Sequence, residues 1–326
     1  MTTVPPYSFL DTRGMEAANG DHYGRQSPPV ADVLADYLAS PKVMKLAKNT
    51  RVSYALSARH INDHLGKKPI CDLSARDCYV FHRALGDKER TANLALGLLS
   101  RACRWAEVMG WRQSGSDPCR AIDRYEHRRN ERVFTVEQLR DILRAIDWLA
   151  ALHNTGGISP VAASLFRFLL FTGCRRSEAM TLRHDEIDLE RRRLVLSKTK
   201  TNGDFARVRP LSHAAIQVLR HRAEHPKQDP VWVFPGRRRG QPMKWPDAPW
   251  RKVLEGADIP HAGLHVLRHS FANTAAMLGI PRTQIGACLG HVSTSSTDRY
   301  LHLYGSNVVA EADRVANTIL ERREVS

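Results

Sequence analysis

A histidine and an arginine stand three positions apart at His265 and Arg268. The apolar spacing around them predicts a helix, whose core stripe is Leu264, Leu267, Phe271, Ala275 and Leu278. Residues three apart share a helix face, so this helix presents an imidazole beside a guanidinium. The pair could hold an anion and move a proton. For an isolated pair, a polar helix edge without a chemical role is the alternative.

A second arginine, Arg175, follows the helix end that Thr172 and Gly173 predict. Glu178 lies one turn further along, and a charge-assisted hydrogen bond from Arg175 to Glu178 would fix the guanidinium in place. Taken alone, this is an ordinary ion pair between residues three apart. The neighbouring Arg176 is a candidate DNA contact.

A lysine stands near the tip of a predicted β-hairpin. The turn pair Asn202-Gly203 separates two strand-like runs, 193–197 and 205–211. Lys200 beside this turn could reach a phosphate or a leaving group, and the choice between Lys198 and Lys200 stays open. Lys198 is also a candidate DNA contact. A solvated turn residue is the alternative.

A further histidine and a tyrosine follow near the C-terminus. Gly290 ends a helix that begins at Pro281, which leaves His291 in a turn. The Ser and Thr residues at 295–297 can cap a short helix that carries Tyr300. A tyrosine in such a place is more often part of the packing than a nucleophile.

The combination matches what cofactor-free transfer of a phosphodiester requires. When a tyrosine attacks a phosphate, negative charge builds up on the non-bridging oxygens, and two guanidiniums can stabilise it without a metal. A phenol, whose ordinary pKa is about 10, needs a base or electrostatic help. The departing 5′ oxygen needs a proton donor. The candidate catalytic set is Arg175, Lys200, His265, Arg268, His291 and Tyr300, with Glu178 in support.

Two groups of elements would position these residues. Residues 1–29 are rich in Gly and Pro, lack the apolar stretch of a signal peptide and predict a flexible N-terminus. Helical periodicity, clearest over 91–109, predicts an all-helical domain over 30–115. Over 116–133 the periodicity stops, and we interpret this basic stretch as a linker. Its candidate contacts with a phosphate backbone are Arg128, Arg129 and Arg132, with a merely solvated linker as the alternative.

The second predicted domain covers residues 134–326. Thr135 to Gln138 fits a capping box, and Ser159-Pro160 starts another helix. The hairpin adds a small antiparallel sheet, and helices then return up to Leu320. The fold class is therefore mainly α, with an all-helical N-terminal domain and an α+β domain of helices and a small antiparallel sheet.

Composition narrows the choice of partner. Among 326 residues, 49 Lys and Arg against 34 Asp and Glu leave a net charge of +15. This excess favours nucleic acid or another anionic surface. No apolar run is long enough for a membrane span, and six cysteines without a C-x-x-C pair indicate buried thiols rather than zinc or disulfides. We expect a cytoplasmic, nucleoid-associated protein.

In order and spacing, the motifs resemble those of the tyrosine recombinases, also called phage integrases. The matching segments are Thr172–Glu178, Lys200, Leu264–Phe271, Leu289–His291 and Thr297–His302. His291 precedes Tyr300 by nine positions, as in the family. The resemblance covers the chain from about Val30 to Leu320.

The resemblance implies a two-domain clamp on double-stranded DNA with a specific core site. Arg175 and Arg268 would bind the scissile phosphate, and His291 would donate a further hydrogen bond. His265 would act as base and Lys200 as acid. The product would be a 3′-phosphotyrosyl bond at Tyr300, formed without ATP, metal or cofactor.

The resemblance also implies an assembly. Four protomers on two sites would exchange strands through a Holliday junction, with accessory DNA-bending proteins as further partners. The amphipathic stretch from Val308 to Ile319 would dock on a neighbouring protomer, and packing against its own domain is the equally simple alternative. The short N-terminal region favours the simple two-domain type over integrases with a separate arm-binding domain.

Three other functions are open to a chain with these residues. A type IB topoisomerase would use nearly the same groups and relax DNA without a partner site. A metal-dependent nuclease would need a carboxylate cluster, which the motifs lack, and would stop in EDTA. A DNA-binding regulator without activity would be unaffected by Tyr300→Phe.

Overall fold

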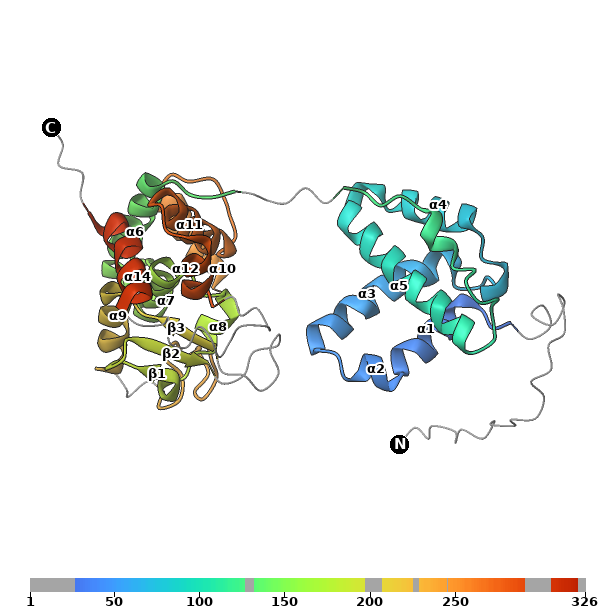
Figure 1. The fold of residues 1–326 in the computed structure, drawn as a ribbon, viewed down its shortest axis with the longest axis horizontal. Helices are drawn as coiled ribbons and strands as arrows, with labels where there is room; N and C mark the ends of the chain where they lie inside the picture. The colour runs from blue at the N-terminus through green and yellow to red at the C-terminus, as the bar shows by residue number, and fades with distance from the viewer. Residues whose placement is uncertain are drawn as a thin grey trace. The chain divides into compact units, whose positions relative to one another are not determined.

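The computed structural model describes residues 27–126, 132–196, 207–224, 229–244, 246–290 and 306–321. The chain divides into two compact units, one up to Arg129 and one from Asn130, and each has its own hydrophobic core. Both are built mainly from helices, and the second contains a small antiparallel sheet (Figure 1). The predicted fold class is confirmed. Most of the expected flexible N-terminus, residues 1–29, lies outside the described residues.

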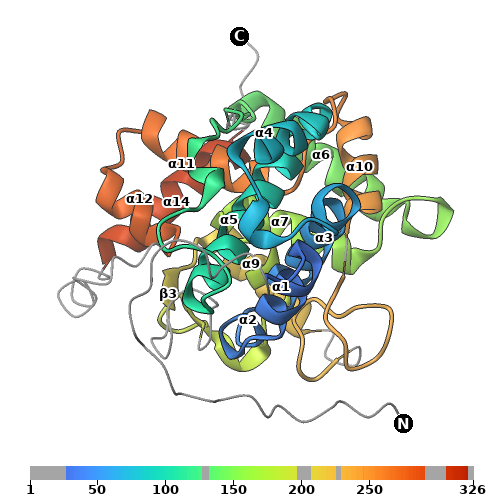
Figure 2. The ribbon, with the colours of Figure 1, turned by 90° about the vertical axis from the view of Figure 1, so that its right-hand side faces the viewer.

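The first unit is all-helical. Its helices are α1 (Val30–Ala39), α2 (Pro41–Met44), α3 (Lys48–Leu65), η1 (Ile70–Asp72), α4 (Ala75–Ala84), η2 (Gly86–Lys88), α5 (Glu89–Val108) and η3 (Pro118–Ala121). Helices α3 and α5 cross each other, and α1 packs beside α3 (Figures 1 and 2). The helix predicted over 91–109 is confirmed as α5, because small and apolar residues line its buried face.

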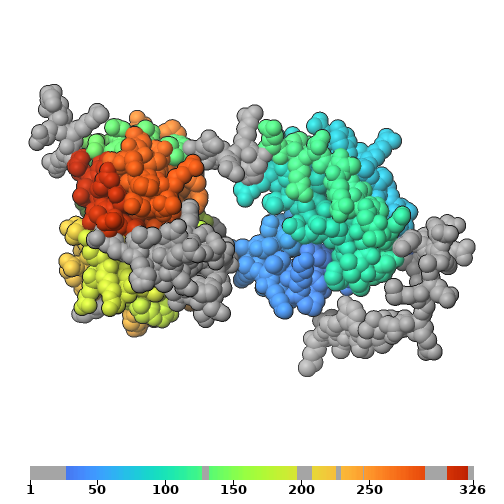
Figure 3. Space-filling view, viewed as in Figure 1, coloured from blue at the N-terminus to red at the C-terminus, as the bar shows by residue number. Residues whose placement is uncertain are grey.

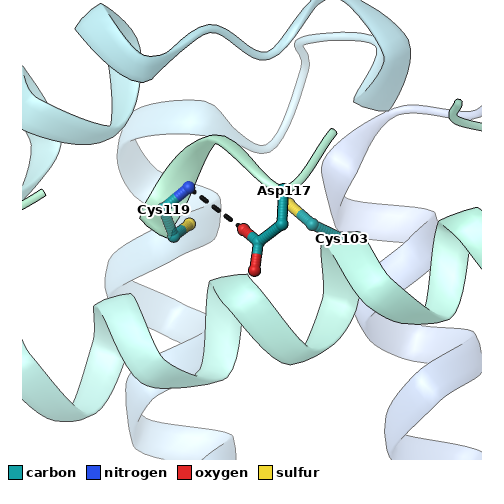
Figure 4. Close-up of side chains that lie close together, drawn as sticks. All are labelled: Cys103, Asp117 and Cys119. Carbon is teal, nitrogen blue, oxygen red and sulfur yellow. Dashed lines mark hydrogen bonds between the residues drawn. The ribbon is translucent and has the colours of Figure 1, made fainter. Parts of the chain in front are cut away.

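The stretch that follows α5 packs against this first core. Asp117 accepts a hydrogen bond from the backbone N–H of Cys119 at 3.0 Å and so caps η3 (Figure 4). It also accepts from the hydroxyl of Ser100 at 2.6 Å. The sulfur atoms of Cys119 and Cys78 lie 3.7 Å apart in the core. Residues 117–121, at the start of the expected linker, therefore belong to the packing of the first unit.

The second unit surrounds one central helix. Its elements are α6 (Val136–Ala151), η4 (His153–Thr155), α7 (Pro160–Thr172), α8 (Arg176–Met180), η5 (His184–Glu186), β1 (Ile187–Asp188), β2 (Arg193–Leu196), β3 (Arg207–Pro210), α9 (His213–Ala223), α10 (Asp247–Gly256), α11 (His265–Met277), α12 (Arg282–Cys288) and α14 (Ser306–Leu320). Helices α6, α9, α11 and α14 all contact α7, which is buried along most of its length. None of the described helices combines the length and apolar composition that a membrane span requires.

Local signals in the sequence explain where these helices begin. The hydroxyl of Thr135 accepts from the backbone N–H of Gln138 at 3.2 Å, and the Gln138 side chain accepts from the backbone N–H of Thr135 at 3.0 Å. The predicted capping box is therefore confirmed. Ser159 caps α7 in the same way, with Pro160 at the first helical position.

The sheet is antiparallel in the order β1-β2-β3. The strands predicted at 193–197 and 205–211 correspond to β2 and β3, while the Asn202-Gly203 turn lies outside the described residues. Leu194 pairs with Arg209 across β2 and β3, and each is 1% exposed. A leucine and an arginine therefore stand next to each other at inward-facing positions.

The last helix, α14, packs against its own unit. Its buried stripe is Val308, Ala312, Val315, Ala316 and Ile319. In the space-filling view, α14 lies beside α12 on one face of the second unit (Figure 3). Asp313 adds an ion pair of 2.6 Å with Arg192. The structure thus shows one of the two alternatives for this stretch, packing within its own domain.

Candidate active site

Gly173 sets the direction in which the chain leaves α7. It adopts a left-handed conformation with φ of +58°, and a Cβ there would approach Leu289 Cδ2 to 2.8 Å and Phe271 Cγ to 2.9 Å. Only glycine fits both the backbone and the space. The chain then turns through the buried Cys174 to Arg175, the N-cap residue of α8.

Glu178 holds Arg175 in place. Arg175 Nη1 donates to Glu178 Oε1 at 3.0 Å, and the backbone N–H of Arg175 donates to Oε2 at 3.1 Å. The ion pair predicted from the sequence is therefore present. Oε2 also accepts from Nη2 of Arg209 at 2.6 Å. One carboxylate thus bridges two guanidiniums, and a mostly buried position (11% of the Glu178 side chain is exposed) strengthens both bonds.

Arg268 connects α11 with two other segments. Its Nη1 donates to the carbonyl oxygen of Gly173 at 2.8 Å, and its Nη2 donates to that of Leu289 at 3.0 Å. Burial, followed by the charges of Arg209 and Arg175, lowers the pKa of Arg268 to about 10. The guanidinium of Arg268 remains protonated at neutral pH. This buried cation therefore lies in the electrostatic field of Arg209 and Arg175.

His265 is the first residue of α11, close to this cation group. The residue is exposed, and its ring meets that of His269 edge-on, with centroids 4.8 Å apart. Although the residue is accessible to solvent, neighbouring protein atoms desolvate part of the ring and so lower the pKa of His265, and the charges of His269, Arg268 and Arg175 lower it further. The neutral imidazole is the form that a base requires.

The structure therefore brings together four of the predicted residues, Arg175, Glu178, His265 and Arg268. The other predicted catalytic residues, Lys200, His291 and Tyr300, lie outside the described residues. The same holds for the alternative lysine Lys198 and for Arg128 and Arg129 of the linker.

Two of the predicted DNA contacts are described. Arg176 forms an ion pair of 3.5 Å with Asp247 at the start of α10. Arg132 donates to the carbonyl oxygens of Pro260 and His261, each at 2.8 Å, which ties the end of the linker to the second unit. Their contact with DNA stays a prediction.

Arg209 is the residue at this site that the sequence reasoning missed. The signal in the sequence was strand alternation. In the strand predicted over 205–211, Arg209 stands two positions before the apolar Leu211, so both side chains point to the same, inward face. An arginine at an inward position needs a buried partner, and Glu178 is that partner.

One group in the described part of the chain has the spacing of metal ligands. Ligand atoms of Cys103, Asp117 and Cys119 in the first unit lie within 4.8 Å of one another (Figure 4). Asp117 already accepts two hydrogen bonds, and contacts with Cys103 and Cys78 raise the pKa of Cys119. A neutral thiol is a poor metal ligand. We interpret the group as core packing around a capped turn.

Comparison with known proteins places these motifs in a family. Residues 132–306 match the model of the phage integrase family. The chain is 27% identical over 156 residues to prophage integrase IntF of Escherichia coli (strain K12). The aligned region makes up 47% of this chain and 32% of that protein. It thus spans about a third of the length of that relative. With a tyrosine recombinase of Thermosipho africanus (strain TCF52B), identity is 26% over 294 residues, 84% of this chain and 95% of that protein.

Solved structures agree at the level of the fold. A lambda integrase, described as a tetramer bound to a Holliday junction, superimposes with a TM-score of 0.67 at 17% identity, over 82% of this chain and 79% of that chain. The family model covers more than half of the chain and includes Arg175, His265 and Arg268. The chain therefore belongs to the phage integrase family, the tyrosine recombinases that its motifs resemble.

Proposed function

We propose that the chain is a site-specific DNA recombinase that cleaves and rejoins double-stranded DNA through a 3′-phosphotyrosyl bond at Tyr300. One observation carries the proposal. Arg175 and Arg268, from separate elements, lie in each other's field around Glu178, with Arg209 as a third cation. Three guanidiniums and one carboxylate leave a surplus of positive charge, which suits a bound phosphate.

The surplus charge would act where the reaction builds up negative charge. The non-bridging oxygens of the scissile phosphate gain charge as the phosphorus becomes five-coordinate. Arg175 and Arg268 are fixed before the substrate arrives, so little reorganisation accompanies the reaction. Partial burial of the site weakens solvent screening and strengthens the attraction.

The chemical step balances without a cofactor. The phenolic oxygen of Tyr300 forms a bond to phosphorus, and the bond from phosphorus to the 5′ oxygen breaks. His265 takes the proton of the phenol, and Lys200, or Lys198 in the other register, gives a proton to the 5′ oxygen. His291 donates a hydrogen bond to the phosphate. Attack by the 5′ hydroxyl of another strand reverses the step and restores Tyr300.

We extend the proposal to the assembly. Residues 30–115 would bind the core site, the basic linker 116–133 would follow the phosphate backbone, and residues 134–326 would carry the chemistry. Four protomers would exchange strands through a Holliday junction, and the lambda integrase described as a tetramer on such a junction supports this arrangement. The chain would act on the chromosome in the cytoplasm.

The decisive experiment captures the covalent product and identifies the core site in the same step. The chain is incubated in EDTA with duplexes of random sequence that carry a nick. The nick lets the short 5′ product diffuse away, which traps the covalent protein–DNA intermediate. Denaturing gels and peptide mapping then locate the bond, and sequencing of the captured DNA gives the core site. We expect an adduct at Tyr300 and none with the Tyr300→Phe variant.

The same material separates the competing functions. An adduct at another residue contradicts the proposal. So does the failure to find any adduct when the capture experiment is repeated. Strand exchange between two captured sites supports recombination. Relaxation of supercoiled plasmids that lack the site would favour a type IB topoisomerase, and loss of cleavage in EDTA would favour a metal-dependent nuclease.

A further inference from the structure

The buried guanidinium of Arg209 enters the reaction described above only through its charge, and its contacts have no assigned role there. Arg209 lies in β3 and is 1% exposed. Its Nη2 donates to Glu178 at 2.6 Å, while Nε and Nη1 are buried without a hydrogen-bond partner. Within the chain as described, this cation is therefore only partly satisfied.

Such an arrangement destabilises the fold. A buried donor without a partner costs about 1–3 kcal/mol, and more when it is charged. Arg209 also lies in the repulsive field of Arg268, whose pKa it lowers. A neutral side chain of similar length would pack here without these penalties. The charge and donors of Arg209 therefore call for a use beyond packing.

The contacts of Arg209 show which groups it controls. Through Glu178, whose other oxygen accepts from Arg175, it connects β3 to the beginning of α8. A carboxylate held on both oxygens cannot rotate away from Arg175 without breaking the bond to Arg209. Arg209 thus restrains Arg175 through the carboxylate that they share.

Arg209 also lies against the chain segment that leads to His291. A Cβ at Gly290 would lie 2.7 Å from Nε of Arg209, and Gly290 has a φ of +62°. The preceding residue, Leu289, is held by Arg268 through its carbonyl oxygen at 3.0 Å. Two guanidiniums therefore contact consecutive residues of this segment.

We infer that Arg209 is a positioning residue for DNA cleavage, which acts through Glu178 to hold Arg175 toward the scissile phosphate and adds its charge to the field there. The inference rests on the proposed function. It assigns Arg209 no contact with the phosphate itself, because the side chain is buried.

The kinetic test compares Arg209→Met, which keeps an unbranched side chain and removes the charge, with Arg209→Lys, which keeps the charge. The measurement is the single-turnover rate of adduct formation at saturating captured duplex, together with the Kd for DNA and the Tm. For Arg209→Met we expect a rate loss of about tenfold or more, below the roughly 10²–10³-fold cost of removing a direct donor. The Kd should stay within about twofold and the Tm should not fall. Arg209→Lys should recover part of the rate.

A matched control separates positioning from general stability. Arg222 is a buried arginine of α9 whose Nε donates to the carbonyl oxygen of Val233 at 3.2 Å. Arg222→Met should lower the Tm and leave the cleavage rate of the folded protein unchanged. A rate within twofold of wild type for Arg209→Met, or a rate loss explained by unfolding, would overturn the inference.

A double-mutant cycle tests the route through Glu178. If Arg209 acts through this carboxylate, Arg209→Met combined with Glu178→Gln should lose little more rate than the more severe single variant. Independent, multiplying losses would show that Arg209 does not act through Glu178.

A measurement without DNA keeps this inference separate from the proposed function. Relaxation of the ¹⁵N–¹H pair at Nε of Arg175 reports how tightly that guanidinium is held. It should be rigid in the wild-type chain and more mobile in Arg209→Met. Unchanged mobility overturns the positioning role even if the chain forms an adduct. Increased mobility supports that role even if adduct formation fails, in which case only the proposed function falls.

Discussion

The guanidinium of Arg268 donates to the carbonyl oxygen of Gly173 at 2.8 Å, so α11 and the turn before Arg175 are fixed to each other directly. This hydrogen bond explains why Arg175 and Arg268 lie close enough to affect each other electrostatically, although they come from distant parts of the sequence. It also makes Gly173 part of the site's architecture, because the left-handed backbone of Gly173 presents this carbonyl to Arg268.

Replacement of Gly173 by alanine should therefore disturb both stability and the site. An L-residue in the left-handed region costs about 1–2 kcal/mol, and overpacking against Leu289 and Phe271 adds about 1–3 kcal/mol. Gly279→Ala is the matched control, since Gly279 has a φ of +74° and open space around its Cβ position. Urea unfolding should show a clearly larger loss for Gly173→Ala, and equal losses would contradict the packing argument.

The two arginines of the proposed phosphate site should serve chemistry more than affinity. Arg175→Ala and Arg268→Lys each remove a fixed guanidinium, and we expect cleavage rates to fall by about 10²–10³-fold or more. The Kd for the captured duplex should change only a few-fold, because many other cations contribute to DNA affinity. Arg251→Ala, which removes an exposed arginine of α10, should leave rate and Kd unchanged. Parallel loss of rate and affinity would assign both arginines to binding.

Much of the fold could be predicted because its signals are local. Capping at Thr135 and Ser159 and the apolar period of α5 depend on residues a few positions apart. The strand β1, with two residues, was missed because it is too short to show an alternating pattern. The predicted contact between Arg175 and Glu178 is also local, within one turn.

The rest of the site depends on contacts between distant segments. The bond from Arg209 to Glu178 joins β3 with α8, and only the paired sheet brings them together. Spacing in the sequence carries no information on such a contact, although an arginine at an inward strand position indicates that a partner exists. The placement of Lys200, His291 and Tyr300 remains a prediction from their motifs.

The pH dependence of cleavage should reflect the lowered pKa of His265. As the base, His265 must be neutral. The ordinary pKa of histidine is about 6.5, and because that of His265 is lowered, the cleavage rate should stay constant from neutral pH to below 6.5 and fall only at lower pH. Because His269 is one cause of the lowered pKa, His269→Gln should move this fall toward higher pH. Single-turnover rates from pH 5 to 8 test this, with His265→Asn removing the titration. A fall centred above 6.5 in the wild type would contradict the assignment.

The same shift has a consequence for stability. The pKa of His265 is lower in the folded chain than in the unfolded chain, so the unfolded chain binds the proton more readily. The free energy of unfolding should therefore decrease as the pH falls below about 6.5, until it passes the lowered pKa. His265→Asn should remove this part of the pH dependence, and an unchanged profile would show that His265 does not contribute.

A loop of the second unit should contribute to DNA affinity without a part in the chemistry. Arg237, Arg238 and Arg239 are all exposed there. The carboxylate of Asp229 accepts from the backbone N–H groups of Val231, Trp232 and Gly240, at 2.9, 3.0 and 2.9 Å, and so fixes both ends of the loop. Three cations on a fixed loop are well placed to displace counterions from a phosphate backbone.

Replacement of all three arginines by alanine should reduce the slope of log K for DNA binding against log salt concentration by up to about three, because each phosphate contact contributes roughly 0.9 to that slope. The cleavage rate at saturating DNA should stay unchanged. Asp229→Asn keeps the three charges and weakens the fixing of the loop, so it should reduce affinity while the salt dependence is largely kept. DNA titrations over a range of salt concentrations provide the measurement. An unchanged salt dependence in the triple variant would show that the loop stays away from DNA, and a lower cleavage rate would connect it to the active site instead.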